Sequence, residues 1–217
     1  MRNTTRAIIS NLSHRYPALT ACEASMEIAV EALLTCFAQG GKLLVCGNGG
    51  SASDSEHIVG ELMKTFMLDR PLDETMCEKI QAAYPEYADK MIANLQRAVP
   101  AISLVSETAL MTAYTNDNSA EMAFAQQVLS YGRPGDILLA ITTSGNSGNV
   151  LNAARIARVT EVKVLGLTGE SGGALKALSD ICICAPSHIT YQIQEYHLPI
   201  YHCLCACVEN ELFGVDA

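Results

Sequence analysis

The sequence predicts an α/β protein in which helices cover both faces of a parallel sheet. Five short runs are almost entirely apolar and are bounded by glycine, proline or charged residues, which is typical of buried strands. They are KLLVC (42–46), AISLV (101–105), DILLAIT (136–142), KVLGLT (163–168) and DICICAP (180–186). Segments with helical spacing separate these runs, and strands that alternate with helices form parallel sheets.

The predicted helices follow in order. Residues 3–40 contain ACEASMEIAVEALLTCFAQGG, in which apolar residues recur at helical spacing before Gly40 and Gly41 end the helix. Further helices are predicted at 51–66, 106–117, 121–132, 149–159, 172–179 and 191–213. The segment of about 69–97 is rich in charges and holds two prolines, so we expect an inserted excursion with helical pieces.

Composition limits the class of protein. The chain has 217 residues, 49% hydrophobic and 17% charged, which suits a single domain with a substantial core. Its net charge of −9 argues against direct nucleic-acid binding. No apolar run reaches the ~18 residues of a membrane span, and the N-terminus is too polar for a secretory signal. We therefore expect a cytoplasmic protein with no membrane partner.

The nine cysteines predict reduced thiols. Their number is odd, most lie in apolar runs, and no C-x-x-C pair occurs. This pattern favours buried free cysteines over a disulfide framework or a metal cluster.

Two loops have the composition of phosphate-binding turns. GNGGSAS (47–53) and TTSGNSGN (142–149) each follow a predicted strand and precede a predicted helix. Glycine lets the backbone approach a ligand, and a helix start offers N–H groups to an anion. The alternative for either loop is an ordinary turn with a helix cap. Neither matches a Walker A motif or a dinucleotide fingerprint, so a single phosphate on a small molecule fits best.

His57 and Glu61 are four residues apart in a predicted helix, so they share one face. An imidazole and a carboxylate placed in this way suit either zinc binding or proton transfer. The alternative is a solvated helix face that carries one histidine.

These motifs resemble the sugar isomerase (SIS) domain, most closely the bacterial phosphoheptose isomerases. The matching stretches are Gly47 to Leu62, Asn116-Asp117, TTSGNSGNV, LTGESGG (167–173) and IQEYHLPIYH (193–202). Such enzymes convert sedoheptulose 7-phosphate to a D-glycero-D-manno-heptose 7-phosphate. The resemblance implies one SIS domain over 1–217, a flavodoxin-like three-layer α/β/α sandwich with a five-stranded parallel sheet. It also implies a cytoplasmic homotetramer that acts in lipopolysaccharide heptose biosynthesis.

The resemblance also implies roles for individual residues. The phosphosugar, chiefly its phosphate, would be held by Asn48, Gly49, Gly50, Ser51, Thr142, Thr143, Ser144 and Ser147. Asn116 and Asp117 would contact its hydroxyl groups. One Zn²⁺ per subunit would be bound by His57, Glu61, Gln194 and His202, and Gln194 would also contact substrate. Glu61 is the implied base and His202 the implied acid, although a zinc-bound carboxylate is a poorer base.

Gln194 and His202 raise a geometric question. Eight residues on a straight helix span ~12 Å, too far for two ligands of one ion. Either Pro199 breaks the helix between them, or one residue comes from a neighbouring chain, which would place the site at a subunit interface. A third reading makes His202 a packed helix residue.

Three features depart from the family pattern. Thr65 and Tyr191 stand where the family has an arginine and an aspartate, with Lys64 and Arg70 near the first position. The segment 69–97 is an insertion, either a lid or an oligomer surface.

The same fold also offers non-catalytic functions. The tail resembles that of the adaptor that binds the bacterial replication initiator DnaA, and sugar-phosphate-sensing regulators share the domain. An enzyme is favoured because His57, Glu61, Gln194 and His202 are all present. An isomerase for another phosphosugar stays open.

Overall fold

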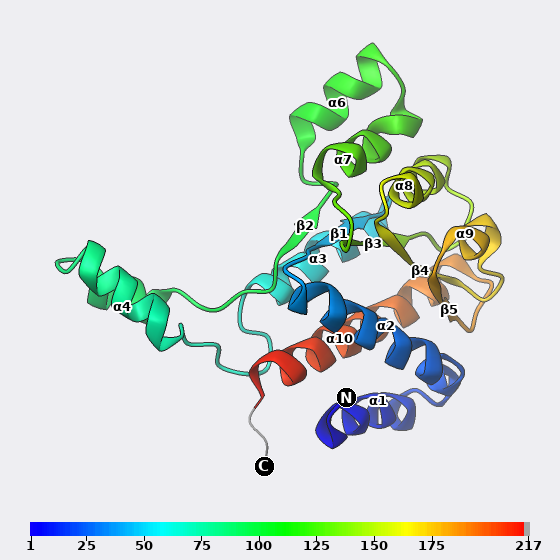
Figure 1. Ribbon diagram of the computed structural model, residues 1–217. Helices are drawn as coiled ribbons and strands as arrows, with labels where there is room; N and C mark the ends of the chain where they lie inside the picture. The colour runs from blue at the N-terminus through cyan, green and yellow to red at the C-terminus, as the bar shows by residue number, and fades with distance from the viewer. Residues whose placement is uncertain (215–217) are drawn as a thin grey trace.

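A computed structural model describes residues 1–214, and its centre is a five-stranded parallel sheet (Figure 1). The strands are β1 (Leu43–Cys46), β2 (Ala101–Ser103), β3 (Ile137–Ile141), β4 (Lys163–Gly169) and β5 (Ile181–Ala185). Their spatial order is β2-β1-β3-β4-β5, with every neighbouring pair parallel. This is the flavodoxin-like order, so the predicted fold class and all five predicted strands are confirmed.

Helices cover both faces of the sheet. One face carries α1 (Asn3–Arg15), α2 (Glu23–Ala38), α3 (Gly50–Met63) and α10 (Thr190–Phe213). The other carries α7 (Ala123–Tyr131), α8 (Gly148–Val159) and α9 (Gly173–Leu178). Successive side chains of a strand point to opposite faces. Accordingly Leu43 and Val45 of β1 enter the first core, and Leu44 and Cys46 enter the second.

The segment expected to be an insertion forms an arm that projects from the body of the protein (Figure 1). We call residues 71–96 the arm; it contains α4 (Glu74–Ala83) and α5 (Ala88–Asn94). Only Ile80 and Ala88 are buried in these two helices. The two ends of the arm meet, because Pro71 and Gln96 form an antiparallel bridge and Arg97 N–H donates to Arg70 O at 2.8 Å.

A buried ion pair anchors the chain between α3 and the arm. Arg70 Nε lies 2.7 Å from Glu209 Oε1 of α10, and each residue is 1% exposed. The same Glu209 carboxylate accepts the backbone N–H groups of residues 66–68, while Arg70 donates to the carbonyls of Glu61 and Leu62. Each charge is thus compensated by hydrogen bonds, which a buried charge requires. The ion pair fixes the end of α3 against α10.

Several boundaries differ from those expected. A 3₁₀ helix, η1 (Pro17–Cys22), interrupts the predicted helical segment 3–40. A second 3₁₀ helix, η2 (Ala120–Met122), precedes α7, and α6 (Thr108–Asp117) buries none of its residues. α10 is one continuous helix with Pro199 inside it, so the possibility that Pro199 breaks the helix is wrong.

All nine cysteines fall within residues 1–214 and are free thiols, six of them buried. Within the same residues, no helix combines the length and apolarity that crossing a membrane requires.

Candidate functional site

The two glycine-serine loops lie side by side at the carboxyl ends of β1 and β3. These strands are neighbours, and the chain leaves them toward helices on opposite faces of the sheet. Ligands of such sheets bind at this switch point. A reciprocal pair of hydrogen bonds joins the loops, from Asn48 Nδ2 to Asn149 Oδ1 (2.8 Å) and from Asn149 Nδ2 to Asn48 Oδ1 (2.9 Å). Helices α3 and α8 therefore begin at one common place.

Local backbone geometry explains the glycines in these loops. Gly49 caps α3 with φ of 56° and ψ of −122°, a conformation that is strained for other residues. Gly145 has φ of 68° and packs so closely on the backbone of Gly172 that a side chain has no room. Both glycines bring backbone to the edge of the site.

Hydroxyl groups gather beside the second loop. Thr142 Oγ1 is 2.9 Å from Ser147 Oγ and 3.5 Å from Ser144 Oγ. Ser51 is buried in the first turn of α3, and its N–H donates to Asn48 O at 3.0 Å. Together with the first N–H groups of two helices, these hydroxyls form an arrangement suited to a phosphate.

A carboxylate lies beside the start of α8. A methyl group added to Gly148 would be 3.2 Å from Glu121 Oε1, and Asn152 Nδ2 donates to Glu121 O at 3.1 Å. Negative charge is favourable at a helix N-terminus, so Glu121 occupies a place that also suits an anionic ligand.

Farther along α3, from its middle toward its end, side chains of α3 and α10 meet. The two helices run in the same direction, since Gln194 lies over Gly50, Tyr201 contacts His57, and Glu209 holds residues 66–68. His57 Nε2 is 3.2 Å from Glu61 Oε1 and 3.4 Å from His202 Nε2. His202 therefore reaches His57 within a single chain.

Two further residues support this cluster. Tyr201 is buried, with its hydroxyl 2.9 Å from His57 Nδ1, and it is close enough to Asp54 for each group to influence the pKa of the other. Burial raises the pKa of Asp54 to about 6, although Tyr201 and His57 counter the shift. Burial and then the charge of Asp54 raise the pKa of Tyr201, so it remains a neutral phenol. The hydroxyl of Tyr201 thus links α10 to His57 of α3.

The histidines of α10 are neutral at neutral pH. Burial, and then the charge of His57, lower the pKa of His202, while Glu61 acts in the opposite direction. Burial lowers the pKa of His197 to about 4, against a hydrogen bond to Thr168 O at 3.2 Å. His197 contacts the end of β4 and is structural, whereas His188 is exposed beside Glu170.

The two cations near Thr65 have different roles. Lys64 Nζ is 3.0 Å from Glu61 Oε2, at the edge of the cluster. Arg70 is fully committed to Glu209 and the end of α3, so it is not available to a ligand. Thr65 donates its backbone N–H to Gln96, and Tyr191 is exposed.

Two groups of expected site residues lie apart from the cluster. Gln194 lies over Gly50, at the start of α3, whereas His202 lies near its middle. Asn116 and Asp117 are exposed at the end of α6 and hydrogen-bond to each other at 2.9 Å. Within this chain, neither group is brought to His57.

The donor chemistry of the cluster suits zinc, whereas its arrangement is incomplete. Among residues 1–214, no three His, Cys, Asp or Glu side chains are arranged as a metal site. The two separations from His57 Nε2, 3.2 and 3.4 Å, are close to the about 3.3 Å between neighbouring donors around tetrahedral zinc. The donor types of His57, Glu61 and His202 and the two distances from His57 Nε2 are compatible with zinc, but the three side chains are not arranged as a complete metal site, and Gln194 does not join them.

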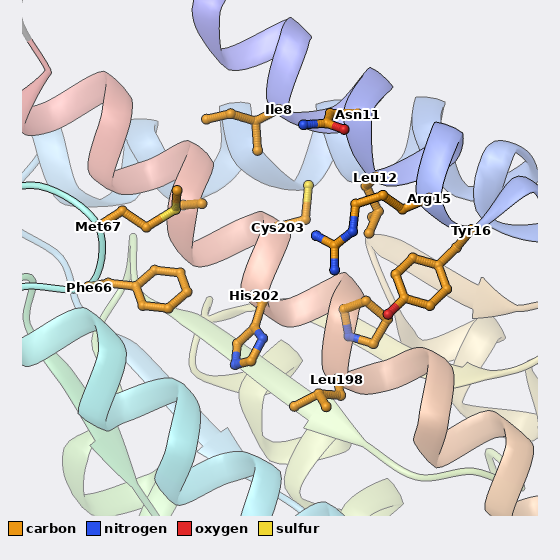
Figure 2. Close-up of a pocket in the computed structure, with 12 residues that line it drawn as sticks. Ile8, Asn11, Leu12, Arg15, Tyr16, Phe66, Met67, Leu198, His202 and Cys203 are labelled. Atoms are coloured by element: carbon orange, nitrogen blue, oxygen red, sulfur yellow. The ribbon is translucent and has the colours of Figure 1, made fainter.

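A groove of about 340 Å³ opens on the α1 side of His202. Figure 2 shows His202 and Leu198 of α10 on one wall with Phe66 close by, and Arg15 and Tyr16 on the other wall. The Phe66 ring lies 5.5 Å from the His202 ring, centroid to centroid. His202 therefore separates this largely apolar groove from His57.

Sequence reasoning missed Asp54, Tyr201, Glu121 and Asn149. The spacing of Asp54 and His57, three residues apart on one helix, was a usable signal for Asp54. The contacts of Tyr201, Glu121 and Asn149 depend on packing between distant segments, which no local pattern indicates.

Fold and loops together define a SIS-domain protein, and comparisons with known proteins agree. The SIS domain model matches residues 10–92 and 80–169. A phosphoheptose isomerase of Shewanella loihica is 37% identical over 209 residues, covering 95% of this chain and 93% of the relative. A phosphoheptose isomerase of Roseiflexus sp. is 40% identical over 192 residues, covering 88% of this chain and 84% of the relative. The solved phosphoheptose isomerase of Neisseria gonorrhoeae has a TM-score of 0.73 at 30% identity, with 94% of both chains covered. The chain belongs to the phosphoheptose isomerase family, as its motifs indicated.

Proposed function

We propose that the protein isomerises sedoheptulose 7-phosphate to D-glycero-D-manno-heptose 7-phosphate. The observation that carries this proposal is the arrangement along α3, with phosphate-type loops at its start and the His57–Glu61–His202 cluster farther along. His57 is seven positions after Gly50, which is about 10 Å farther along the helix. This span is comparable with an extended seven-carbon chain whose phosphate and carbonyl are at opposite ends. The names of the relatives agree with this reaction.

The phosphate is held at the start of α3 and α8. Backbone N–H groups near Gly49 and Gly50 approach it from one side, and Ser51 adds a hydroxyl. Thr142, Thr143, Ser144 and Ser147 approach from the other side. Asn48 links the loops and lies beside the sugar. Gln194 lies over Gly50, so its amide faces the substrate near the phosphate end.

The reaction moves a proton between C1 and C2 through an enediol. Glu61 removes the proton from C1 of the ketose, the C1–C2 double bond forms, and O2 gains a proton. His202 exchanges the oxygen-bound protons, and its neutrality is compatible with donation from an imidazole N–H. Return of a proton to C2 and loss of the O1 proton give the aldehyde.

His57, Glu61 and His202 would hold one zinc ion. When bound, zinc would supply Lewis-acid polarisation of the carbonyl oxygen. Gln194 would complete the set only from a neighbouring subunit or after rearrangement.

The protein would act as a cytoplasmic homotetramer in lipopolysaccharide heptose biosynthesis, with neighbouring subunits completing the sites. The groove beside His202, the exposed α6 and the arm are surfaces available for such contacts. Asn116 and Asp117, both on α6, would reach the sugar hydroxyls through such an arrangement.

The second candidate is isomerisation of another phosphosugar. It is favoured by Thr65 and Tyr191, which replace an arginine and an aspartate of the family pattern, and by the arm.

The test is an isomerase assay on sedoheptulose 7-phosphate, with zinc measured in the same sample, for the wild type and His202→Ala. We expect turnover and stoichiometric zinc in the wild type and loss of both in the variant. Zinc with turnover of a different phosphosugar alone would establish the second candidate. No zinc and no turnover of any phosphosugar would overturn the enzyme assignment of this site and favour an adaptor, which a DnaA pull-down would test.

A further inference from the structure

The arm ends in two exposed tyrosines. Its tip joins α4 to α5 and has the sequence Tyr-Pro-Glu-Tyr, residues 84–87, which we call the arm tip. Tyr84 is 59% exposed and Tyr87 is 61% exposed, and Glu86 between them is exposed as well. Tyrosine is one of the residues that most often carry the binding energy of protein interfaces. Two such side chains on a projecting tip therefore form a candidate contact surface.

The groove beside His202 has complementary chemistry. Most of its lining is apolar, and the Arg15 guanidinium extends into it (Figure 2). Arg15 lies over the ring of Tyr16 at 5.4 Å. The volume of about 340 Å³ falls within the range of pockets that take a small ligand, about 300–1,000 Å³. The groove therefore suits aromatic side chains accompanied by one negative charge.

The charges around the two surfaces are opposite in sign. Helix α1 carries Arg6 and Arg15 and has no acidic residue, although the chain as a whole has a net charge of −9. Acidic residues outnumber basic ones in the arm, with Asp73, Glu74, Glu78, Glu86 and Asp89 against Lys79 and Lys90. Within residues 1–214, neither Arg15 nor Glu86 has an ionic partner. Each of these two charges is thus available to the other.

The arm is held so that its tip does not reach the groove of its own chain. Its base is fixed by the bridge between Pro71 and Gln96, and Arg97 Nε donates to Pro71 O at 2.9 Å. Arg97 also lies over the ring of Phe213 at 5.0 Å. From this base the arm points away from α1 (Figure 1). Because the tip and the groove belong to one sequence, a second copy of the chain supplies the partner of each.

We propose that the arm tip of one copy binds in the groove beside His202 of a second copy, with its two tyrosines against the apolar walls and Glu86 paired with Arg15. A two-fold axis makes such a contact reciprocal, so that each copy gives an arm and receives one. The docked tip would cover the outer side of His202 and exclude water from it. Only this last consequence rests on the proposed function, since the contact itself needs neither substrate nor metal.

The size of the contact decides how it is detected. A tyrosine buries about 150–250 Å² when fully covered, and Tyr84 and Tyr87 still expose 59% and 61%. Reciprocal docking would cover about 350–600 Å² of tyrosine and a similar area of groove, about 700–1,200 Å² altogether. Interfaces of this size are weak by themselves. The test therefore reports the contact directly instead of relying on the molecular mass of the assembly.

The test is photo-cross-linking of the purified full-length protein. Tyr87→p-benzoylphenylalanine keeps an aromatic ring at the arm tip and makes it photo-reactive. After irradiation we expect a covalent dimer on a denaturing gel, with the new bond mapped by mass spectrometry to residues 8–16, 66–67 or 198–206. Tyr191 is 60% exposed and lies at the start of α10, so the same substitution there is the control and should give no bond to the groove.

Charge reversal shows that the contact joins two copies. Glu86→Arg in the chain that carries the probe should lower the yield of cross-linked dimer about tenfold, because like charges then face each other. Co-expression with a chain that carries Arg15→Glu should restore the yield, since the ion pair forms again with reversed polarity. A co-expressed chain with Arg6→Glu, an exposed change on the same helix outside the groove, should not restore it. Circular dichroism confirms that each variant is folded.

Three results would each overturn the proposal: no covalent dimer with the probe at position 87, a bond that maps outside the groove, or a yield that charge reversal does not change. If the variant at position 87 does not fold, the same probe at Tyr84 decides the matter. A cross-linked dimer without turnover of sedoheptulose 7-phosphate would support this inference and contradict the proposed function. Turnover without a cross-link would do the reverse.

Discussion

The two ends of the candidate site are built in different ways. At the phosphate end, backbone and hydroxyl groups come from short loops that directly follow β1 and β3. At the cluster end, His57 and Glu61 of α3 meet His202 from α10, and the two histidines are 145 positions apart in the sequence. The phosphate end should therefore be sensitive to changes at glycine, and the cluster end to single side chains and to the packing of α10.

Glu61→Gln should produce the largest effect, confined to the cluster end. A positioned acid or base contributes typically 10²–10⁴-fold, so kcat should fall by about that factor while the phosphosugar still binds. Steady-state kinetics and binding titration measure the two quantities separately. Glu56→Gln, an exposed change on the same helix, is the control and should be near wild type. An equal fall in kcat in Glu61→Gln and Glu56→Gln would contradict the role of Glu61 as the catalytic base.

Glu209→Gln should lower the free energy of unfolding, because it breaks the buried ion pair that holds the end of α3 against α10. Removing one partner of a buried ion pair costs about 3–5 kcal/mol of unfolding free energy, and the change would leave the Arg70 charge buried without compensation. Urea unfolding measures it. Glu170→Gln breaks the exposed contact with His188 and should cost less than about 1 kcal/mol. Similar unfolding free energies of the two variants would contradict the inference that Glu209 holds the end of α3 against α10.

His197 should make α10, and with it the cluster end, sensitive to acid. Its pKa is lowered from 6.5 to about 4, so the folded state binds the proton less tightly than the unfolded state. The resulting stability is present above pH 6.5 and is lost as pH falls toward 4, by about 3 kcal/mol between pH 7 and pH 4. Denaturant unfolding at several pH values should show that His197→Gln loses this part of the pH dependence. His188→Gln, which changes an exposed histidine, should keep it.

Gly49→Ala should affect the phosphate end selectively. Alanine in this backbone conformation costs about 1–3 kcal/mol, so KM for the phosphosugar should rise about tenfold with little change in kcat. Gly60→Ala is a matched control on the same helix, because nothing lies within 4 Å of the added methyl group. A fall in kcat without a change in KM would mean that the two ends are not separable.

Glu121→Gln should give the smallest effect, with the opposite sign. Removing a negative charge beside the first turn of α8 should lower KM a few-fold at low salt, and the difference should shrink as salt screens the charge. Tighter binding of inorganic phosphate would be visible by calorimetry. Unchanged KM at all salt concentrations would place Glu121 outside the electrostatic reach of the ligand.

The difference between the two ends also explains what the sequence could predict. The strands, the loops after β1 and β3, and the pairing of His57 with Glu61 all follow from local spacing, and the structure has them as expected. The helical pieces of the arm are as expected from its sequence, in which charges and prolines interrupt the apolar pattern, whereas its origin as an insertion stays a prediction.

What the sequence could not predict depends on how distant elements pack. The contact of Tyr201 with Asp54 and His57 requires α3 and α10 to run side by side in register. The same register places Gln194 at Gly50, away from His202. Pro199 was a misleading signal, since a long helix packed along its length tolerates a proline that a sequence pattern treats as a break.

The meeting of the arm's two ends has a consequence for how such proteins diversify. The chain leaves the body at Pro71 and returns beside it at Gln96, and Val99 N–H then donates to Leu62 O. A short turn that joins positions 71 and 96 would leave the sheet, the loops and the cluster in place. The length and sequence of the chain between these two positions can therefore vary without moving the rest of the protein.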